Sequence, residues 1–193
     1  MDTAIWVVIA LVALVVIGAL VWYGMTRRRT GQLREQFGPE YDRTVDETED
    51  RRAAESELLE RRRRVEKLDI RTLDPATRTS FADRWSAVQA RFVDDPMSAV
   101  GEADELVILV MRERGYPMDE FDQRVADVSV DHPGLVEDYR AAHGISERVR
   151  SNQATTEDMR QALVHYRALF SELLDEGDRG NMREVRDDAA TKQ

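Results

Sequence analysis

The sequence contains no cysteine, few glycines and prolines, and few aromatic residues. Its 193 residues include 10 glycines, 5 prolines and no cysteine, and 7% of them are aromatic. The absence of cysteine excludes disulfide frameworks, thiolate zinc sites, iron–sulfur clusters and cysteine nucleophiles. The glycines occur singly, so the phosphate-binding Gly-x-Gly-x-x-Gly and Walker A patterns are absent, as is the Gly-x-Ser-x-Gly elbow of serine hydrolases. We therefore predict no catalytic residues and no cofactor.

The chain also lacks an excess of basic charge. It carries 38 acidic and 28 basic residues, for a formal net charge of −10. Contacts with nucleic-acid phosphates require a basic face. The charge balance therefore argues against nucleic acid as a partner.

A 22-residue apolar segment near the N-terminus is the strongest signal in the sequence. Of the residues Ala4–Met25, 20 are hydrophobic. As an α-helix this segment is roughly 33 Å long, against about 30 Å for the hydrocarbon core of a bilayer. A cleaved signal peptide would instead have a basic N-terminal region and a shorter apolar stretch. We predict a single uncleaved transmembrane helix with a basic flank, within residues 1–29.

Residues at the ends of this segment predict its orientation. Aromatic rings favour the headgroup boundary, and arginines favour the cytoplasmic side. Because arginines follow the segment and none precedes it, we expect a single-pass protein of the cell membrane, with its N-terminus outside and its body in the cytoplasm. The predicted membrane-interface residues are Trp6, Trp22, Tyr23, Arg27, Arg28 and Arg29.

Residues 30–69 form a strongly charged juxtamembrane segment. Between residues 39 and 68 there are 18 charged residues in 30 positions, ten acidic and eight basic. Pro39 suits the first turn of a helix, and Glu40 and Asp42 then lie near the positive end of its dipole. Apolar positions are too sparse for a self-sufficient heptad repeat, so a coiled coil is the less favoured alternative. We predict a solvated helical stalk that docks one end on the body.

Residues 70–174 have apolar residues at the spacing of buried helix faces, with boundaries marked by capping residues. Short connections favour antiparallel neighbours, and no alternating β pattern occurs. The predicted fold class is therefore all-α, with a compact antiparallel bundle of four to five helices after the anchor and stalk. Residues 175–193 lack apolar periodicity and are predicted to be disordered. The predicted helix starts are Asp74-Pro75, Asp95-Pro96, Asp119, Asp131 and Thr155 or Thr156. The second of these helices is predicted to end at Gly115, and its unbroken apolar run Leu106–Met111 predicts a central position. The predicted inward residues are Phe81, Trp85, Val88, Phe92, Val100, Ala103, Val107, Val110, Met111, Phe121, Val125, Val128, Leu135, Tyr139, Ala142, Val149, Met159, Leu163, Tyr166, Phe170 and Leu173.

Four short stretches of the sequence are similar to a group of bacterial proteins. In them the chain resembles a widespread set of small, membrane-anchored helical proteins, common in actinobacteria and uncharacterised in function. The resemblance extends over most of residues 33–174 and implies the same architecture, but no activity or site residue. The stretches are FGPEYDRTV (Phe37–Val45), RFVDDP (Arg91–Pro96), SVDHP (Ser129–Pro133) and HYRALF (His165–Phe170).

Three histidines are the obvious candidates for chemistry. His132 lies in an Asp-His-Pro turn, His143 lies beside a predicted buried stripe, and His165 lies at the edge of an apolar helix face. No Glu-x-x-His or His-x-x-x-His pair occurs, so no metal site is predicted. Structural roles are favoured, with His132 and His143 kept as pocket candidates. Trp85 is a third candidate, either as a core residue or as an interface anchor.

Two classes of function remain. The favoured hypothesis is a membrane-tethered cytoplasmic interaction module, an adaptor or scaffold, whose partners are the lipid bilayer and another protein. The alternative is a small membrane-anchored enzyme or ligand-binding protein with a polar pocket between bundle helices. A large apolar pocket with convergent ionisable groups would favour the alternative.

Overall fold

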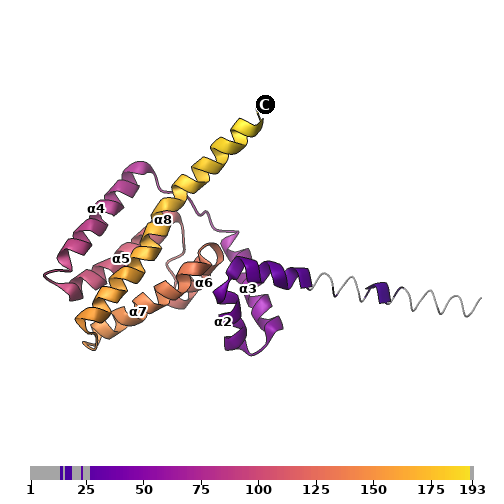
Figure 1. Cartoon of the computed structure of the whole chain (residues 1–193), viewed down its shortest axis with the longest axis horizontal. Coiled ribbons are helices and arrows are strands. Elements are labelled where there is room, and N and C mark those ends of the chain that lie inside the picture. The colour runs from indigo at the N-terminus through magenta and orange to yellow at the C-terminus, as the bar shows by residue number, and fades with distance from the viewer. Residues whose placement is uncertain (1–13, 15, 19–22, 24–26, 192–193) are drawn as a thin grey trace, which may run out of the picture. The chain divides into compact units, whose positions relative to one another are not determined.

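The computed structural model describes residues 14, 16–18, 23 and 27–191, and their side chains up to Asp175. The regular secondary structure of these residues is helical, which confirms the predicted all-α class (Figure 1). The chain divides into two compact units, Met1–Glu60 and Arg61–Gln193. The stalk and the bundle were expected to meet at residue 70, so the division falls earlier than predicted.

Most of the predicted transmembrane segment lies outside the described residues. Of Ala4–Met25 the structure describes residues 14, 16–18 and 23, which are helical. The predicted interface residues Trp6 and Trp22 also lie outside. Among the described residues, no helix combines the length and the apolar character that a membrane crossing requires.

The first unit contains three helical segments in place of one continuous stalk helix. Residues 27–37 are helical, α2 spans Pro39–Thr48, and α3 begins at Arg51 and runs to Val65. Gly38 interrupts the chain with a φ of 49°, and Glu49 ends α2 with a φ of 55°. Both values lie in the left-handed region, which cannot continue an α-helix. The helix expected over residues 39–68 therefore begins at Pro39, as predicted, but is broken at Glu49.

The breaks allow sparse apolar residues to share a core. No single segment of this unit has a continuous apolar stripe, but side chains from all three segments are buried. Glu55 on α3 accepts hydrogen bonds from Thr30 Oγ1 at 2.8 Å and from Tyr41 Oη at 3.0 Å, and thereby links the three segments. The buried apolar residues, each 3% exposed or less, are Leu33, Phe37, Tyr41, Ala54 and Leu58.

In the second unit, α4 and α5 begin where the sequence predicts. Asp74 caps α4 (Pro75–Arg91) by accepting hydrogen bonds from two first-turn amides at 3.0 Å. Asp95 caps α5 (Pro96–Arg114) through one amide at 3.2 Å. Such caps satisfy amides that have no partner within the helix. The proline after each aspartate suits the first helical turn.

The residue that follows α5, Gly115, has to be a glycine for two reasons. Its φ is 98°, and a Cβ atom there would collide with the main-chain oxygen of Asp69. Beside it, the Arg71 amide donates to the Arg114 carbonyl at 2.8 Å, and Arg71 Nε donates to the Glu113 carbonyl at 2.9 Å. The segment before α4 is therefore fixed on the C-terminal end of α5, and a side chain at residue 115 would displace it.

The fourth bundle helix begins later than predicted. Asp131, expected as its N-cap, is instead the last residue of α6 (Phe121–Asp131) and accepts a hydrogen bond from Tyr116 Oη at 3.0 Å. The amide of His132 still bonds to Val128, but Pro133 has no amide to continue the ladder. A short 3₁₀ turn, η1 (Pro133–Leu135), therefore precedes α7 (Val136–Arg150).

The last helix, α8 (Thr156–Thr191), extends past the predicted end of the bundle at residue 174. Thr155 and Asp158 form a reciprocal cap: Thr155 Oγ1 accepts from the Asp158 amide at 3.1 Å, and Asp158 Oδ2 accepts from the Thr155 amide at 2.8 Å. The backbone is helical to Thr191, where disorder was predicted from residue 175. A helix that is already nucleated by the packed residues before 175 adds further residues at little cost.

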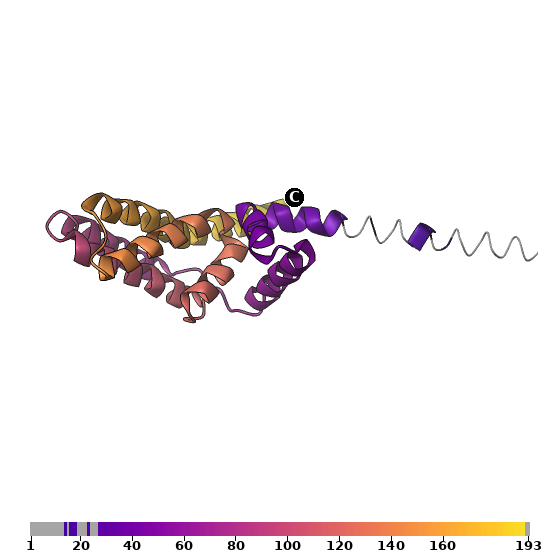
Figure 2. The ribbon, with the colours of Figure 1, turned by 90° about the horizontal axis from the view of Figure 1, so that it is seen from below.

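Helix α5 lies at the centre of the second unit and contacts α4, α7 and α8. Figures 1 and 2 show α5, α7 and α8 side by side, with α4 and α5 joined as a hairpin. The predicted bundle therefore consists of the five helices α4 to α8 within the described residues. Predicted inward residues that are buried in this core are Phe81, Trp85, Val88, Val100, Ala103, Val107, Val110, Met111, Val125, Val128, Tyr139, Ala142, Val149, Met159, Tyr166, Phe170 and Leu173.

Candidate functional site

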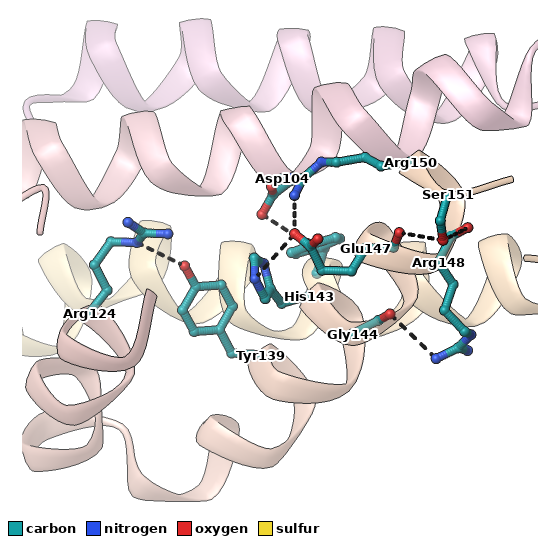
Figure 3. Close-up of polar contacts among 10 residues, drawn as sticks. Asp104, Arg124, Tyr139, His143, Gly144, Glu147, Arg148, Arg150 and Ser151 are labelled. Carbon is teal, nitrogen blue, oxygen red and sulfur yellow. Dashed lines mark hydrogen bonds and ion pairs between the residues drawn. The ribbon is translucent and has the colours of Figure 1, made fainter. Parts of the chain in front are cut away.

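A carboxylate lies inside the bundle where α5, α7 and α8 meet. Asp104 on α5 is 5% exposed. Its Oδ1 accepts a hydrogen bond from Tyr166 Oη on α8 at 2.8 Å, and its Oδ2 accepts one from Arg150 Nη2 on α7 at 3.0 Å (Figure 3). A buried charge is tolerated when it is paired and hydrogen-bonded. Both oxygens of Asp104 meet that condition.

Two buried tyrosines flank this carboxylate. Burial raises the pKa of Tyr166, and the neighbouring charge of Asp104 raises it further. Burial also raises the pKa of Tyr139, against the opposing effect of Arg124, whose Nε donates to Tyr139 Oη at 3.3 Å. Both hydroxyls therefore stay protonated at neutral pH. Each acts as a hydrogen-bonding group and not as a proton acceptor.

His143, one of the predicted pocket candidates, lies beside this cluster on α7. Its imidazole stacks on the Phe121 ring of α6, with centroids 3.6 Å apart and an interplanar angle of 11°. Its Nε2 lies 3.7 Å from Glu147 Oε1. Burial lowers the pKa of His143, while Asp104 and Glu147 act in the opposite direction. The neutral ring is therefore the form that this packing favours.

The polar side chains converge on one another. In Figure 3 those of Asp104, Glu147 and His143 point toward a common region between α5 and α7, and Arg150 pairs with both carboxylates. We refer to Asp104, Tyr139, His143, Glu147, Arg150 and Tyr166 as the Asp104 cluster. Its chemistry is proton binding and charge pairing, and its geometry fixes α5, α7 and α8 against one another.

The structure places His132 and Trp85 in other environments. His132 lies between α6 and η1 with its side chain 2% exposed, and its Nδ1 is 3.9 Å from Glu172 Oε1. Trp85 on α4 is 6% exposed and stacks on Phe170 of α8, with centroids 4.6 Å apart. The three candidates therefore do not form one site. Trp85 is a core residue, the first of the two roles considered for it.

His165 forms a second histidine–carboxylate contact. Its Nδ1 lies 2.7 Å from Asp138 Oδ1, joining α8 to α7, and the two side chains are 28% and 35% exposed. The edge position predicted for His165 is confirmed. The contact with Asp138 could not be predicted, because the two residues are 27 positions apart.

Sequence reasoning missed the central residue of the Asp104 cluster. Asp104 shares the helix face of Val100, Val107 and Met111, since all four lie three or four residues apart. A carboxylate on an otherwise apolar stripe was therefore a detectable signal. Tyr139 and Tyr166 were predicted as buried residues, but their hydroxyl partners were not.

A second buried carboxylate fixes the start of this unit. Asp127 on α6 is 1% exposed, and its Oδ1 accepts hydrogen bonds from Arg64 Nε at 2.8 Å and from Gln123 Nε2 at 3.2 Å. Arg64 belongs to the run of four arginines at 61–64, for which the flanking glutamates favour a solvated, salt-bridged helix face. Its role is an ion pair inside the protein.

A hollow of about 200 Å³ lies between α4 and α5. Buried Val88 and Leu106 form its apolar floor, and charged side chains stand at its rim. His132, His143 and Trp85 do not line it. The lining residues are Arg84, Ala87, Val88, Glu102, Glu105 and Leu106.

The predicted membrane-interface residues that are described lie at the start of the first unit. Tyr23 is 55% exposed, and the guanidinium of Arg27 lies 5.4 Å from the centre of its ring. Arg27, Arg28 and Arg29 are exposed at the beginning of the helix over residues 27–37.

Within the described residues, no group of three or more acidic or histidine side chains is arranged to hold a metal ion. Comparisons of the chain with protein-family models, curated proteins and solved structures gave no match. The proposals that follow therefore rest on the sequence and on the geometry of the two units.

Proposed function

We propose that this protein is a membrane-tethered helical interaction module, an adaptor or scaffold. The segment Ala4–Met25 is its transmembrane anchor, and residues 26–193 lie on the cytoplasmic side. The exposed arginines that follow the apolar segment support this orientation. The resemblance to membrane-anchored bacterial proteins is consistent with the same arrangement.

One observation carries the non-catalytic part of this proposal. Both carboxylate oxygens of Asp104 accept hydrogen bonds inside the bundle, from Tyr166 and Arg150, and the His143 ring is stacked on Phe121. A catalytic group has to reach a substrate atom within hydrogen-bonding distance. Because both oxygens of Asp104 are already bonded within the bundle, this carboxylate serves the fold. The function then depends on the outer surface of the second unit and on its attachment to the membrane.

The hollow between α4 and α5 supports a second candidate, a small-ligand-binding protein. Its apolar floor with Arg84, Glu102 and Glu105 at the rim has the composition of a ligand site, although 200 Å³ is below the usual ~300–1,000 Å³ of such sites. Ligand-induced amide shifts confined to the residues around the hollow, and lost on Leu106→Trp, would support this alternative.

Single-cysteine labelling tests the orientation, because the natural chain contains no cysteine. One cysteine replaces Thr3, and in a second variant one replaces the exposed Ser151. A membrane-impermeant maleimide applied to intact cells should label position 3 and not position 151. Permeabilisation should make position 151 reactive. The reverse pattern would show that the body faces outward.

Cross-linking in cells tests the interaction module. Photoreactive residues at exposed positions of the second unit should give a cross-linked partner of defined mass. Deleting residues 3–25 should remove the product while the purified body stays helical. His132→Gln, His143→Gln and His165→Gln should each keep it. A histidine variant that abolishes the cellular phenotype without loss of stability would overturn the adaptor proposal in favour of an enzyme.

A further inference from the structure

The N-terminal part of the chain carries a net positive charge. Residues 3–34 contain four arginines and no acidic residue, whereas residues 35–193 carry a net charge of −13. The positive region therefore coincides with the apolar segment and the first turns that follow it. A segment of net positive charge in an acidic protein has a local electrostatic preference opposite to that of the rest of the chain.

The structure separates these four arginines into two kinds. Arg34 serves the fold of the first unit, because its Nη2 is 2.6 Å from Asp42 Oδ1 and its guanidinium is 5.5 Å from the centre of the Tyr41 ring. Arg27, Arg28 and Arg29 precede that core and are exposed. Arg27 lies against Tyr23, an aromatic residue of the type that favours the headgroup boundary.

Consecutive residues on a helix point about 100° apart, since there are 3.6 residues per turn. Arg27, Arg28 and Arg29 therefore spread around the helix and do not form one face. A basic face suits a helix that lies flat on a membrane. Positive charge distributed around the axis suits a helix that leaves the membrane at a steep angle, with headgroups on several sides.

We propose that Arg27, Arg28 and Arg29 form a collar that binds the headgroups of anionic phospholipids in the cytoplasmic leaflet. This inference rests on the proposed membrane tether and adds the lipid class to it. A guanidinium forms paired hydrogen bonds with phosphate oxygens. A zwitterionic headgroup carries its own ammonium group, which cancels the attraction. Anionic headgroups lack that compensation, so the collar discriminates between the two.

The acidic charge of the rest of the chain supports the assignment of lipid binding to these three arginines. Residues 35–193, with their net charge of −13, are repelled by an anionic surface, within a Debye length of about 8 Å at physiological salt. Attraction is therefore confined to the collar. Lipid selectivity should depend on these three arginines and not on exposed arginines elsewhere in the chain.

The test uses the full chain reconstituted into vesicles of equal parts phosphatidylcholine and phosphatidylglycerol. The protein is extracted with mild detergent, and the lipids retained by it are quantified by mass spectrometry. Each arginine near the surface contributes about 1 kcal/mol, equivalent to ~5-fold. We expect at least ~5-fold enrichment of phosphatidylglycerol, reduced to near parity in the variant R27Q/R28Q/R29Q and by 0.5 M salt.

A matched control removes the same charge elsewhere. The variant R63Q/R112Q/R167Q replaces three exposed arginines of the second unit and should retain the full enrichment. Equal loss in both variants, or equal retention, would overturn the collar. Circular dichroism of both variants checks that the fold is unchanged.

Alkaline carbonate extraction of the same vesicles separates this inference from the tether. A chain that resists extraction but shows no lipid preference would refute the collar and leave the tether intact. A chain that carbonate extracts, yet that retains phosphatidylglycerol through Arg27, Arg28 and Arg29, would refute the transmembrane anchor and leave the collar intact.

Discussion

The two units bury their apolar residues by different routes. In the second unit each helix presents a regular stripe, such as Phe81, Trp85 and Val88 on α4, and a common core covers it. In the first unit the buried residues are scattered over three segments, from Leu33 to Leu58, among many charges. A helix that buries a face of its own has visible periodicity. A helix that contributes two or three residues to a shared core does not.

The two units also differ in how they use buried polar groups. The first unit joins its segments through Glu55, which accepts two hydroxyl hydrogen bonds. The first unit also buries Glu40, whereas in the second unit the buried Asp104 and Asp127 are each paired to an arginine. Removing one partner from a buried pair leaves the other uncompensated. We therefore expect polar substitutions to be more costly in the second unit.

The largest expected effect is in the core of the second unit. Trp85→Ala should lower the free energy of unfolding by about 3–5 kcal/mol, because it removes a buried ring that stacks on Phe170. Chemical denaturation of the full chain in detergent, followed by circular dichroism, measures this. Trp85→Phe keeps a ring at the position and should cost less. A loss below about 1 kcal/mol would contradict the core position of Trp85.

The next effect tests whether the first unit is folded or is a solvated stalk. Phe37 is fully buried, so Phe37→Ala should destabilise this unit by about 3 kcal/mol. Amide hydrogen exchange should rise in α2 and in the first half of α3, with little change in α5. The exposed Gln32→Ala is the matched control and should change neither. Unaltered exchange in Phe37→Ala would restore the stalk interpretation.

A smaller loss is expected at the Asp104 cluster. Asp104→Ala should cost about 2 kcal/mol, because Tyr166 Oη and Arg150 lose their acceptor inside the protein. Thermal or chemical unfolding measures the loss. Glu105→Ala, on the exposed side of the same helix, should stay within about 0.5 kcal/mol. In combination with Tyr166→Phe the two effects should not add, since the side chains share one hydrogen bond. Additive losses would show that the contact contributes nothing.

The smallest effect is a pH dependence from His143. Burial lowers the pKa of this imidazole in the folded protein, so the unfolded chain binds the proton more readily. The stabilising contribution is therefore full above the unfolded pKa of about 6.5, and is lost as the pH falls from there toward the lower folded pKa. Asp104 and Glu147 oppose the shift, while Arg124 and Arg150 reinforce it.

Melting temperatures between pH 5 and pH 8 measure this dependence. His143→Phe keeps a ring against Phe121 and removes the titrating group, so it should flatten the acid side of the curve. His165→Gln is the control for general loss of a histidine and should leave the His143 component in place. An unchanged slope in His143→Phe would show that other groups cause the acid sensitivity.

Local chemistry was enough to predict most helix boundaries of the second unit. Asp74 and Asp95 each precede a proline and supply an oxygen to first-turn amides, and Gly115 has the positive φ that ends α5. There are two exceptions. At Asp119 no cap forms, because α6 begins at Phe121 after Glu120, and at Asp131 the amide of His132 continued the α6 ladder until Pro133 stopped it. In the two N-caps the proline follows the aspartate directly, whereas one residue separates Asp131 from Pro133, and that residue extends α6.

The sequence by itself determined the all-α class, the central position of α5, and the charge division between the N-terminal region and the body. These follow from periodicity, capping and composition, which act over a few residues. Only the tertiary structure decided that residues 27–60 fold as a unit, that Asp104 joins Tyr166 and Arg150, and that His132 and His143 lie in separate contacts. Such pairs are up to 62 residues apart in the chain. Whether two such residues come into contact depends on how whole helices pack. A local sequence pattern carries no information about contacts between residues so far apart in the chain.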